Sequence, residues 1–308
     1  GDLELHIALA AVPRSLDPTL AADSYSIKVV SQIYEGLLSY HPYARPYQLI
    51  PALASEMPTV SQDKLTYSFT LREDVFFADD PCFPNGKGRK VTAQDFVYAF
   101  KRFAHPETQA TGWWLLDGKI EGLNEWRSKL EQDIADMRGK GQEVEPLYGI
   151  DRPLSGIQAM GEQGLLIRLG AAGEANLGSR VCHNNRDDDR DGLVDMSDPD
   201  CVNKPYPALL WVLAMPYAAV YPHEAVEYYG RDFARHPVGT GPFKMKSYER
   251  DTRIVLEENP NFREAHVPDP VGNPDDRLPG WDWLEDVDAG LLVHAGERIP
   301  LVAGIELS

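Results

Sequence analysis

The densest group of potential metal ligands in this sequence lies at residues 187–198, which read DDDRDGLVDMSD. When Asp187 is position 1 of a twelve-residue calcium loop, carboxylates fall at positions 3, 5, 9 and 12, and Gly192 falls at position 6, where such loops turn sharply. Position 7 supplies a backbone carbonyl to the ion. The predicted ligands are therefore Asp187, Asp189, Asp191, Leu193, Asp195 and Asp198.

Oxygen ligands on a short loop favour Ca²⁺ over Zn²⁺. The final Asp has a shorter reach than the usual Glu, and no clear helices flank the loop, so a helix–loop–helix site is not expected. We expect a structural role for the ion, because the polar insertion at residues 173–204 has almost no apolar side chains of its own. The alternative is a solvated acidic loop that binds no ion.

Two of the three cysteines, Cys182 and Cys201, bracket this polar stretch, and Cys82 stands alone beside Pro81 and Phe83. We interpret Cys182 and Cys201 as a disulfide, because a solvated loop gives a reduced thiol little to pack against. The bridge would imply an oxidising compartment. The alternative is a pair of reduced thiols.

Signatures of catalysis are absent from the sequence. It has no Gly-x-x-x-x-Gly-Lys-Ser/Thr phosphate loop and no Gly-x-Ser-x-Gly turn, and its His223-Glu224 pair lacks the second His of a zinc protease. With 48 acidic residues against 30 Lys and Arg, the net charge is −18, which repels phosphate backbones. We therefore expect a protein that is not an enzyme and binds no nucleic acid.

The 308 residues are enough for two domains, and a hydrophobic content of 43% is enough for a buried core. No apolar run approaches the ~20 residues of a membrane-spanning helix. Alternating or short apolar stretches predict strands at residues 3–9, 65–71, 164–169, 252–256 and 299–307. Helical spacing predicts helices at residues 24–38, 92–103, 124–139 and 222–229. Residues 266–290, rich in Pro, Gly and Asp, should form a loop.

Two helix starts carry capping signals. Ser24 or Ser26 could cap the first helix, and Thr92 with Asp95 forms the pattern of a capping box. Because strands and helices are interspersed, the expected fold class is α/β or mixed α+β.

Several separated motifs carry a family resemblance. They are SLDP at residues 15–18, QIYEGLL at 32–38, PALA at 51–54, VTAQDFVY at 91–98, PVGTGPF at 237–243 and RIVLE at 253–257. In this order and spacing, over roughly residues 3–265, the sequence resembles the extracellular solute-binding proteins of ABC importers, in the family 5 branch that takes up peptides, nickel and similar ligands. Residues 182–201 separately resemble the calcium repeats of thrombospondin type 3.

The resemblance implies a type II periplasmic-binding-protein-like fold, in which two lobes close on a ligand. It assigns residues 1–46 and 162–263 to the core subdomain of the first lobe and 47–161 to a subdomain inserted into it. Residues 173–204 would be a further insertion. Residues 264–308 would begin the second lobe or form a linker, with most of that lobe absent from this chain.

The resemblance also suggests ligand contacts. Asp23, Ser24 and Tyr25 match the loop that approaches the ligand in family members, although simple helix capping is the alternative. Trp113 and Trp114 match a segment that can line the cleft, although packing in the core is the alternative.

The glycines at 239 and 241 suggest a tight backbone approach that a Cβ would obstruct, with an ordinary turn as the alternative. The resemblance implies an exported, periplasmic or extracellular protein, which could be anchored to the membrane. It would be a monomer that captures a small solute, with a short peptide as the expected ligand, and delivers it to an ABC permease. The alternative function is a structural or interaction module stabilised by calcium.

Overall fold

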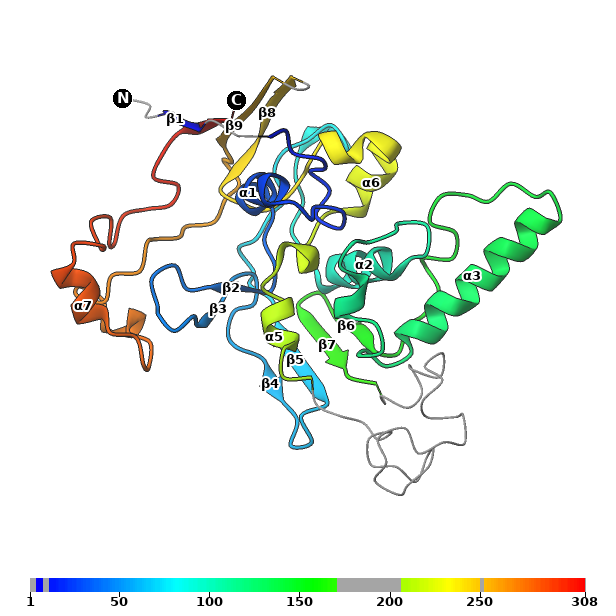
Figure 1. Ribbon diagram of the computed structural model, residues 1–308, viewed down its shortest axis with the longest axis horizontal. Coiled ribbons are helices and arrows are strands. Elements are labelled where there is room, and N and C mark those ends of the chain that lie inside the picture. Colours follow the sequence, from blue (N-terminus) through cyan, green and yellow to red (C-terminus); the bar gives the residue numbers. More distant parts are fainter. Residues whose placement is uncertain (1–3, 8–10, 171–205, 250–251, 308) are drawn as a thin grey trace. The chain divides into compact units, whose positions relative to one another are not determined.

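A computed structural model describes residues 4–7, 11–170, 206–249 and 252–307 of the chain (Figure 1). The predicted calcium ligands and the Cys182–Cys201 pair lie outside these residues and stay predictions. In the described part, no helix is both long and apolar enough to cross a membrane.

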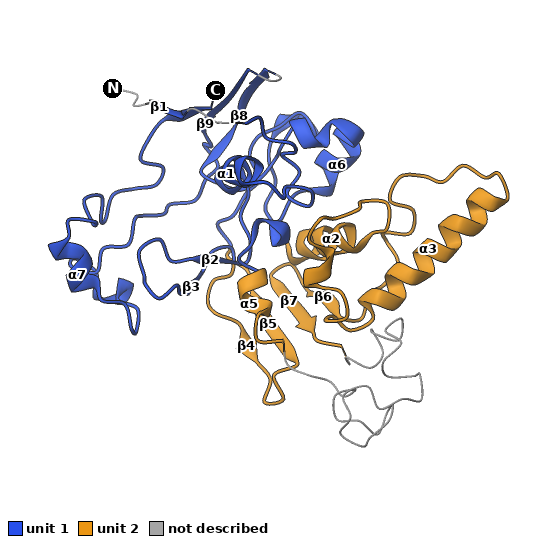
Figure 2. Ribbon diagram, in the orientation of Figure 1, with its two compact units in different colours: residues 1–53, 73–91, 213–308 blue, residues 54–72, 92–212 orange. Residues whose placement is uncertain are grey.

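The chain divides into two compact units (Figure 2). Unit 1 comprises residues 1–53, 73–91 and 213–308, and unit 2 comprises residues 54–72 and 92–212. Their strands and helices are interspersed along the chain, so the fold is mixed α/β as the sequence predicts.

Unit 1 is built around a four-stranded sheet in the order β1-β10-β9-β8. Its strands are β1 (Glu4–Ile7), β8 (Phe243–Glu249), β9 (Arg253–Glu258) and β10 (Gly304–Leu307). β10 pairs with β1 in parallel and with β9 in antiparallel orientation, so the last strand of the described chain lies beside the first. In β9 and β10, Ile254, Leu256, Ile305 and Leu307 are buried, and in β9 the buried residues alternate as expected for a strand with one covered face.

Helix α1 (Ser24–Ile33) contacts β8 through an apolar face that buries Val29, Val30 and Ile33. It ends earlier than the predicted residue 38, because Tyr34 adopts an extended backbone and its hydroxyl accepts a hydrogen bond from the Val238 amide at 3.2 Å.

The remaining elements of unit 1 are short. They are the hairpin β2 (Leu38–Tyr40) and β3 (Leu49–Pro51), the helices α6 (His223–Tyr229) and α7 (Trp283–Asp288), and the 3-10 turns η1 (Pro84–Gly86), η6 (Pro216–Ala218), η7 (Gly230–Arg235) and η8 (Pro274–Asp276). Helix α6 confirms the prediction at residues 222–229, whereas α7 is a helical turn inside a segment predicted to be entirely loop. The Asp282 carboxylate caps α7 by accepting from the Glu285 amide at 3.2 Å.

Unit 2 contains an antiparallel sheet in the order β4-β5-β7-β6. Its strands are β4 (Thr59–Val60), β5 (Thr66–Thr70), β6 (Ile157–Met160) and β7 (Gly164–Arg168), and its helices are α2 (Ala93–Ala104), α3 (Leu123–Gly139), α5 (Leu209–Val212) and the 3-10 turn η2 (Trp113–Leu115). Helix α2 packs against β6 and β7 and buries Phe96, Phe100 and Phe103. The predicted capping box is present, since Asp95 accepts a 2.8 Å hydrogen bond from the Thr92 amide.

These units differ from the sequence-based subdomains in four segments, the first of which is 47–53, at the start of the predicted inserted subdomain but in unit 1. β7 pairs with β5 along its whole length, and therefore residues 164–168 belong to unit 2 rather than to the core subdomain. Residues 73–91 belong to unit 1, where the Ala78 amide bonds to the Gly239 carbonyl at 2.9 Å. Residues 264–308 also lie in unit 1, because β10 completes its sheet.

Candidate ligand-binding site

In unit 1, the segment predicted to approach the ligand lies at the start of α1. Asp23 is the N-cap: one carboxylate oxygen accepts from the amides of Tyr25 and Ser26 at 3.1 and 2.8 Å. The other accepts from the Ser26 hydroxyl at 2.6 Å. The cap is therefore Asp23, and neither Ser24 nor Ser26 as the sequence suggested.

These bonds control the charge of Asp23. Partial burial alone would raise its pKa, but the hydrogen bonds from Ser26 outweigh this effect and hold the pKa below the ordinary value of a carboxylic acid. Asp23 is thus ionised, and its carboxylate caps the start of α1. Ser24 is exposed and Tyr25 is half-buried, so these two side chains of the predicted loop remain available to a ligand.

The Gly239-Thr240-Gly241 turn packs directly on the C-terminal end of α1. A Cβ on Gly239 would lie 2.1 Å from the Ile33 carbonyl oxygen, and one on Gly241 would lie 2.6 Å from that of Gln32. This confirms the predicted close approach. The Gly241 amide uses it to donate a 2.8 Å hydrogen bond to the Ile33 carbonyl.

In unit 2, the two predicted tryptophans sit on η2 in different environments. Trp113 is half-buried, and the Arg127 guanidinium lies 4.9 Å from its ring centroid. The same guanidinium donates a 2.7 Å hydrogen bond to the Ala104 carbonyl at the end of α2, so Trp113 is part of a packed connection between elements. Trp114 is 72% exposed and offers a free aromatic face. Asp23–Tyr25 and this pair belong to different units.

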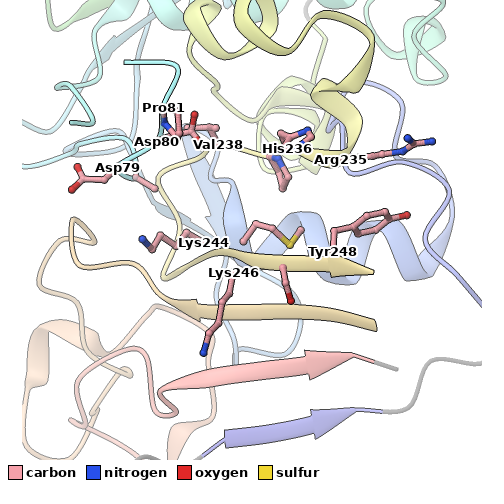
Figure 3. Close-up of a pocket in the computed structure, with 13 residues that line it drawn as sticks. Asp79, Asp80, Pro81, Arg235, His236, Val238, Lys244, Lys246 and Tyr248 are labelled. Atoms are coloured by element: carbon pink, nitrogen blue, oxygen red, sulfur yellow. The ribbon is translucent and has the colours of Figure 1, made fainter. Parts of the chain in front are cut away.

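A pocket that sequence reasoning missed lies in unit 1, with a cavity volume of about 520 Å³ (Figure 3). Asp79 and Asp80 lie at one end and Arg235 and Tyr248 at the other, with His236 between them. Nothing in the sequence could have indicated it, because its walls come from three separate segments without a shared motif.

The acidic end of this pocket is already occupied by hydrogen bonds. The Lys87 ammonium, the Gly88 amide and the Asn261 side chain bond to Asp79 and lower its pKa to about 2. Asp80 accepts from the Tyr229 hydroxyl at 2.9 Å and from the Cys82 amide at 2.8 Å.

The Tyr229 hydroxyl and the Cys82 thiol, next to Asp80, are held in their protonated forms. Burial and the Asp80 carboxylate raise the pKa of Tyr229 and of the free thiol Cys82 well above their ordinary values. A protonated thiol is a poor nucleophile. The hydrogen bond from Tyr229 to Asp80 therefore joins the end of α6 to the 79–82 loop and does not activate a group for catalysis.

The sequence matches the family described as "Bacterial extracellular solute-binding proteins, family 5 Middle" over residues 48–176 and 193–275. The chain belongs to this family. The description names extracellular solute-binding proteins, and the match covers more than half of this chain.

Curated relatives of this family 5 chain are named for peptides. The periplasmic murein peptide-binding protein MppA of Escherichia coli K12 is 32% identical over 112 residues, which are 36% of this chain and 18% of the relative. The oligopeptide-binding protein OppA of Bacillus subtilis is 36% identical over 110 residues, again 36% of this chain and 18% of the relative. The glutathione-binding protein GsiB of Salmonella paratyphi A is 28% identical over 262 residues, or 85% of this chain and 36% of the relative.

Solved structures agree in fold. Listeria monocytogenes OppA bound to peptide has a TM-score of 0.62 at 20% identity, and the pheromone receptor PrgZ has 0.61 at 19% identity. Each comparison covers 100% of this chain but only 42% and 43%, respectively, of the solved chain. This family 5 chain therefore spans well under half the length of these relatives.

Proposed function

We propose that this chain is part of the substrate-binding component of an ABC import system, and that its ligand is a short peptide. The observation that carries the proposal is the family 5 match over residues 48–176 and 193–275, together with relatives named for murein peptides, oligopeptides and dipeptides. The protein works outside the cytoplasmic membrane, as a free or membrane-anchored monomer, and passes its ligand to a membrane permease.

The described side chains support a peptide ligand. Ser24 offers an exposed hydroxyl beside the fixed start of α1, Tyr25 offers a half-buried ring, and Trp114 offers an exposed indole face. Hydroxyls and aromatic faces suit a ligand with regular polar groups and variable side chains. Two nearby charged side chains already have partners within the fold. The Asp23 carboxylate accepts a hydrogen bond from the Ser26 amide, and the Arg127 guanidinium beside Trp113 donates one to the Ala104 carbonyl.

Native mass spectrometry of the gently purified chain tests the proposal. A co-purified mass within the range of short peptides, lost when the protein is denatured, supports it. A mixture of tri- to pentapeptides added to the stripped chain should restore the adduct, whereas free amino acids should not. Failure of every peptide to bind, under conditions in which the chain is folded, would sink the proposal for this chain.

We propose separately that one Ca²⁺ binds at Asp187, Asp189, Asp191, Leu193, Asp195 and Asp198. A disulfide between Cys182 and Cys201 would close the surrounding loop. The same mass spectrum provides the test: a mass increment of one Ca²⁺ that a chelator removes supports the ion. A mass two protons lower in non-reducing than in reducing conditions supports the bridge. Replacing Asp189 and Asp191 with Asn should remove the ion and leave peptide binding as a separate readout.

A further inference from the structure

Residues 268–295 form a long excursion of unit 1, which we call the strap. Its neck is closed by backbone hydrogen bonds: the Val267 amide donates to the Glu297 carbonyl at 2.9 Å, and the Gly296 amide donates to the Val267 carbonyl at 2.9 Å. Between these bonds the strap contains η8 and α7 (Figure 1). The strap therefore has a fixed base and a body that must be held by other contacts.

The body is held by one tryptophan. Trp281 is 5% exposed and is the single large hydrophobic side chain buried within residues 268–295, all of which the structure describes. Its ring centroid lies 4.5 Å from that of His41 and stacks at 6.3 Å on Tyr43, in the loop between β2 and β3. Nearby, the Gln48 side chain donates a 2.8 Å hydrogen bond to the Pro279 carbonyl.

Four large hydrophobic side chains of the strap face solvent. Val271, Leu284, Leu291 and Val293 are each more than half exposed. They contribute little to docking, since stabilisation follows the apolar area that is buried. Trp281, packed on His41 and Tyr43, is therefore the best-buried large hydrophobic side chain of the strap.

His41 is built into this cluster as a neutral ring. Its Nδ1 accepts hydrogen bonds from the backbone amides of Tyr43 and Ala44 at 3.3 and 2.9 Å. An Nδ1 that accepts cannot carry a proton, so the ring proton resides on Nε2. The residue is 3% exposed, and Nε2 has no hydrogen-bond partner within the described part of the chain.

Three charged groups face this ring. Arg45, in its own loop, disfavours a second positive charge, while Asp276 and Asp286 of the strap favour one. Burial is the largest effect, and the pKa of His41 lies below the ordinary histidine value. Both carboxylates are already engaged: Asp286 accepts from the Trp281 indole at 2.6 Å, and Asp276 accepts from the Asp269 amide at 2.7 Å.

Protonation of His41 is therefore incompatible with the docked arrangement. The new N–H at Nδ1 would point at two backbone donors, and the positive charge would have no water around it. The charged ring must leave its place, and the loop at residues 41–48 must open with it.

We propose that His41 is an acid-sensitive latch: at neutral pH it holds the strap through Trp281, and on mild acidification it becomes protonated and releases the strap from the β2–β3 loop. The release uncovers Trp281 and Tyr43 while the neck at 265–299 stays closed. The device does not depend on the ligand or on the importer role.

Hydrogen–deuterium exchange of the full chain, corrected for the intrinsic effect of pH on exchange, tests the latch. Between pH 7.5 and 5, amides of the strap should lose protection relative to those of β8 and β9 in the same unit. Because release of the strap takes up one proton, its protection against exchange can fall by at most about tenfold for each pH unit below ~6.5. Equal behaviour of the strap and the β8–β9 hairpin would overturn the proposal.

The variant His41→Asn separates titration from docking. Its side-chain oxygen can accept the same backbone amides but takes up no proton in this range. Strap protection should then be the same at both pH values, whereas the control His6→Asn, on exposed β1, should keep the wild-type response. A pH response that survives in His41→Asn contradicts the latch.

A second readout covers the case in which His41→Asn fails to fold. In the wild-type chain, the imidazole proton resonance of His41 should titrate below the ordinary histidine value, because burial disfavours its charged form. A His41 midpoint at or above the ordinary value would overturn the proposal without any variant.

Discussion

The Glu35 carboxylate lies 2.7 Å from the Arg263 guanidinium and accepts a 3.0 Å hydrogen bond from the Thr240 hydroxyl. These contacts join three segments that are distant in sequence: the chain after α1, the turn at 239–241 and the chain after β9. The side chains of Glu35 and Arg263 are only 14% and 11% exposed, so water screens the pair poorly.

Glu35→Gln should therefore destabilise the protein markedly. It leaves the Arg263 charge without a carboxylate in a mostly buried place, a change that typically costs about 3 kcal/mol or more. The matched control is Glu249→Gln, which breaks the exposed pair with Arg253 and should leave stability almost unchanged, because water screens that pair. Urea unfolding of both variants measures the difference, and equal midpoints would contradict the assigned role of Glu35.

Gly239→Ala should also lower stability. The added Cβ would approach the Ile33 carbonyl oxygen to 2.1 Å, and relieving such a clash costs about 1–3 kcal/mol. Gly139→Ala is the control, because nothing lies within 4 Å of its Cβ position at the end of α3, and alanine there should be neutral or slightly stabilising. Thermal melts that rank the two variants the other way would refute the close approach.

The contacts around Glu35 and Gly239 show what local sequence can and cannot predict. The capping box at Thr92 and Asp95 and the end of α3 at Gly139 were predictable, because each depends on neighbouring residues. The end of α1 was not predictable from local sequence, because the Tyr34 hydroxyl accepts a hydrogen bond from the amide of Val238, which is distant in the sequence. The extent of a helix is thus set by a tertiary contact.

Dependence on tertiary contacts also explains why the candidate site and the strap could not be fully predicted from the sequence. The sequence predicts a helix that begins near Asp23, but the hydrogen bonds from Ser26 to its carboxylate depend on the folded backbone. Residues 266–290 lack any periodic pattern, so a loop was the natural prediction. The burial of Trp281 against His41 could not be derived, since no motif links the two residues.

Asp23 predicts an acid-dependent contribution to stability. Because its pKa in the folded state is lowered, the unfolded state binds the proton more tightly, and the contribution is present above the unfolded value and lost as pH falls through the folded value. Asp23→Ala should cost about 1 kcal/mol at neutral pH, as removal of a helix cap does. Urea midpoints measured from pH 6 to pH 3 should converge for wild type and variant at the acid end, and a constant gap would contradict this assignment.

Trp113 and Trp114 should separate packing from ligand contact. Trp113→Ala removes the ring that the Arg127 guanidinium covers and should lower the unfolding free energy by about 1 kcal/mol or more. Trp114→Ala removes a ring that is 72% exposed, so its effect on unfolding should stay within about 0.5 kcal/mol.

If the proposed peptide site uses the exposed indole, Trp114→Ala should nevertheless reduce peptide retention in native mass spectra severalfold, because the lost stacking surface served the ligand and not the fold. The control Trp211→Ala, a second exposed tryptophan of unit 2, should leave retention unchanged. Equal retention by Trp114→Ala and wild type would remove Trp114 from the site and leave Ser24 and Tyr25 as the described residues to test.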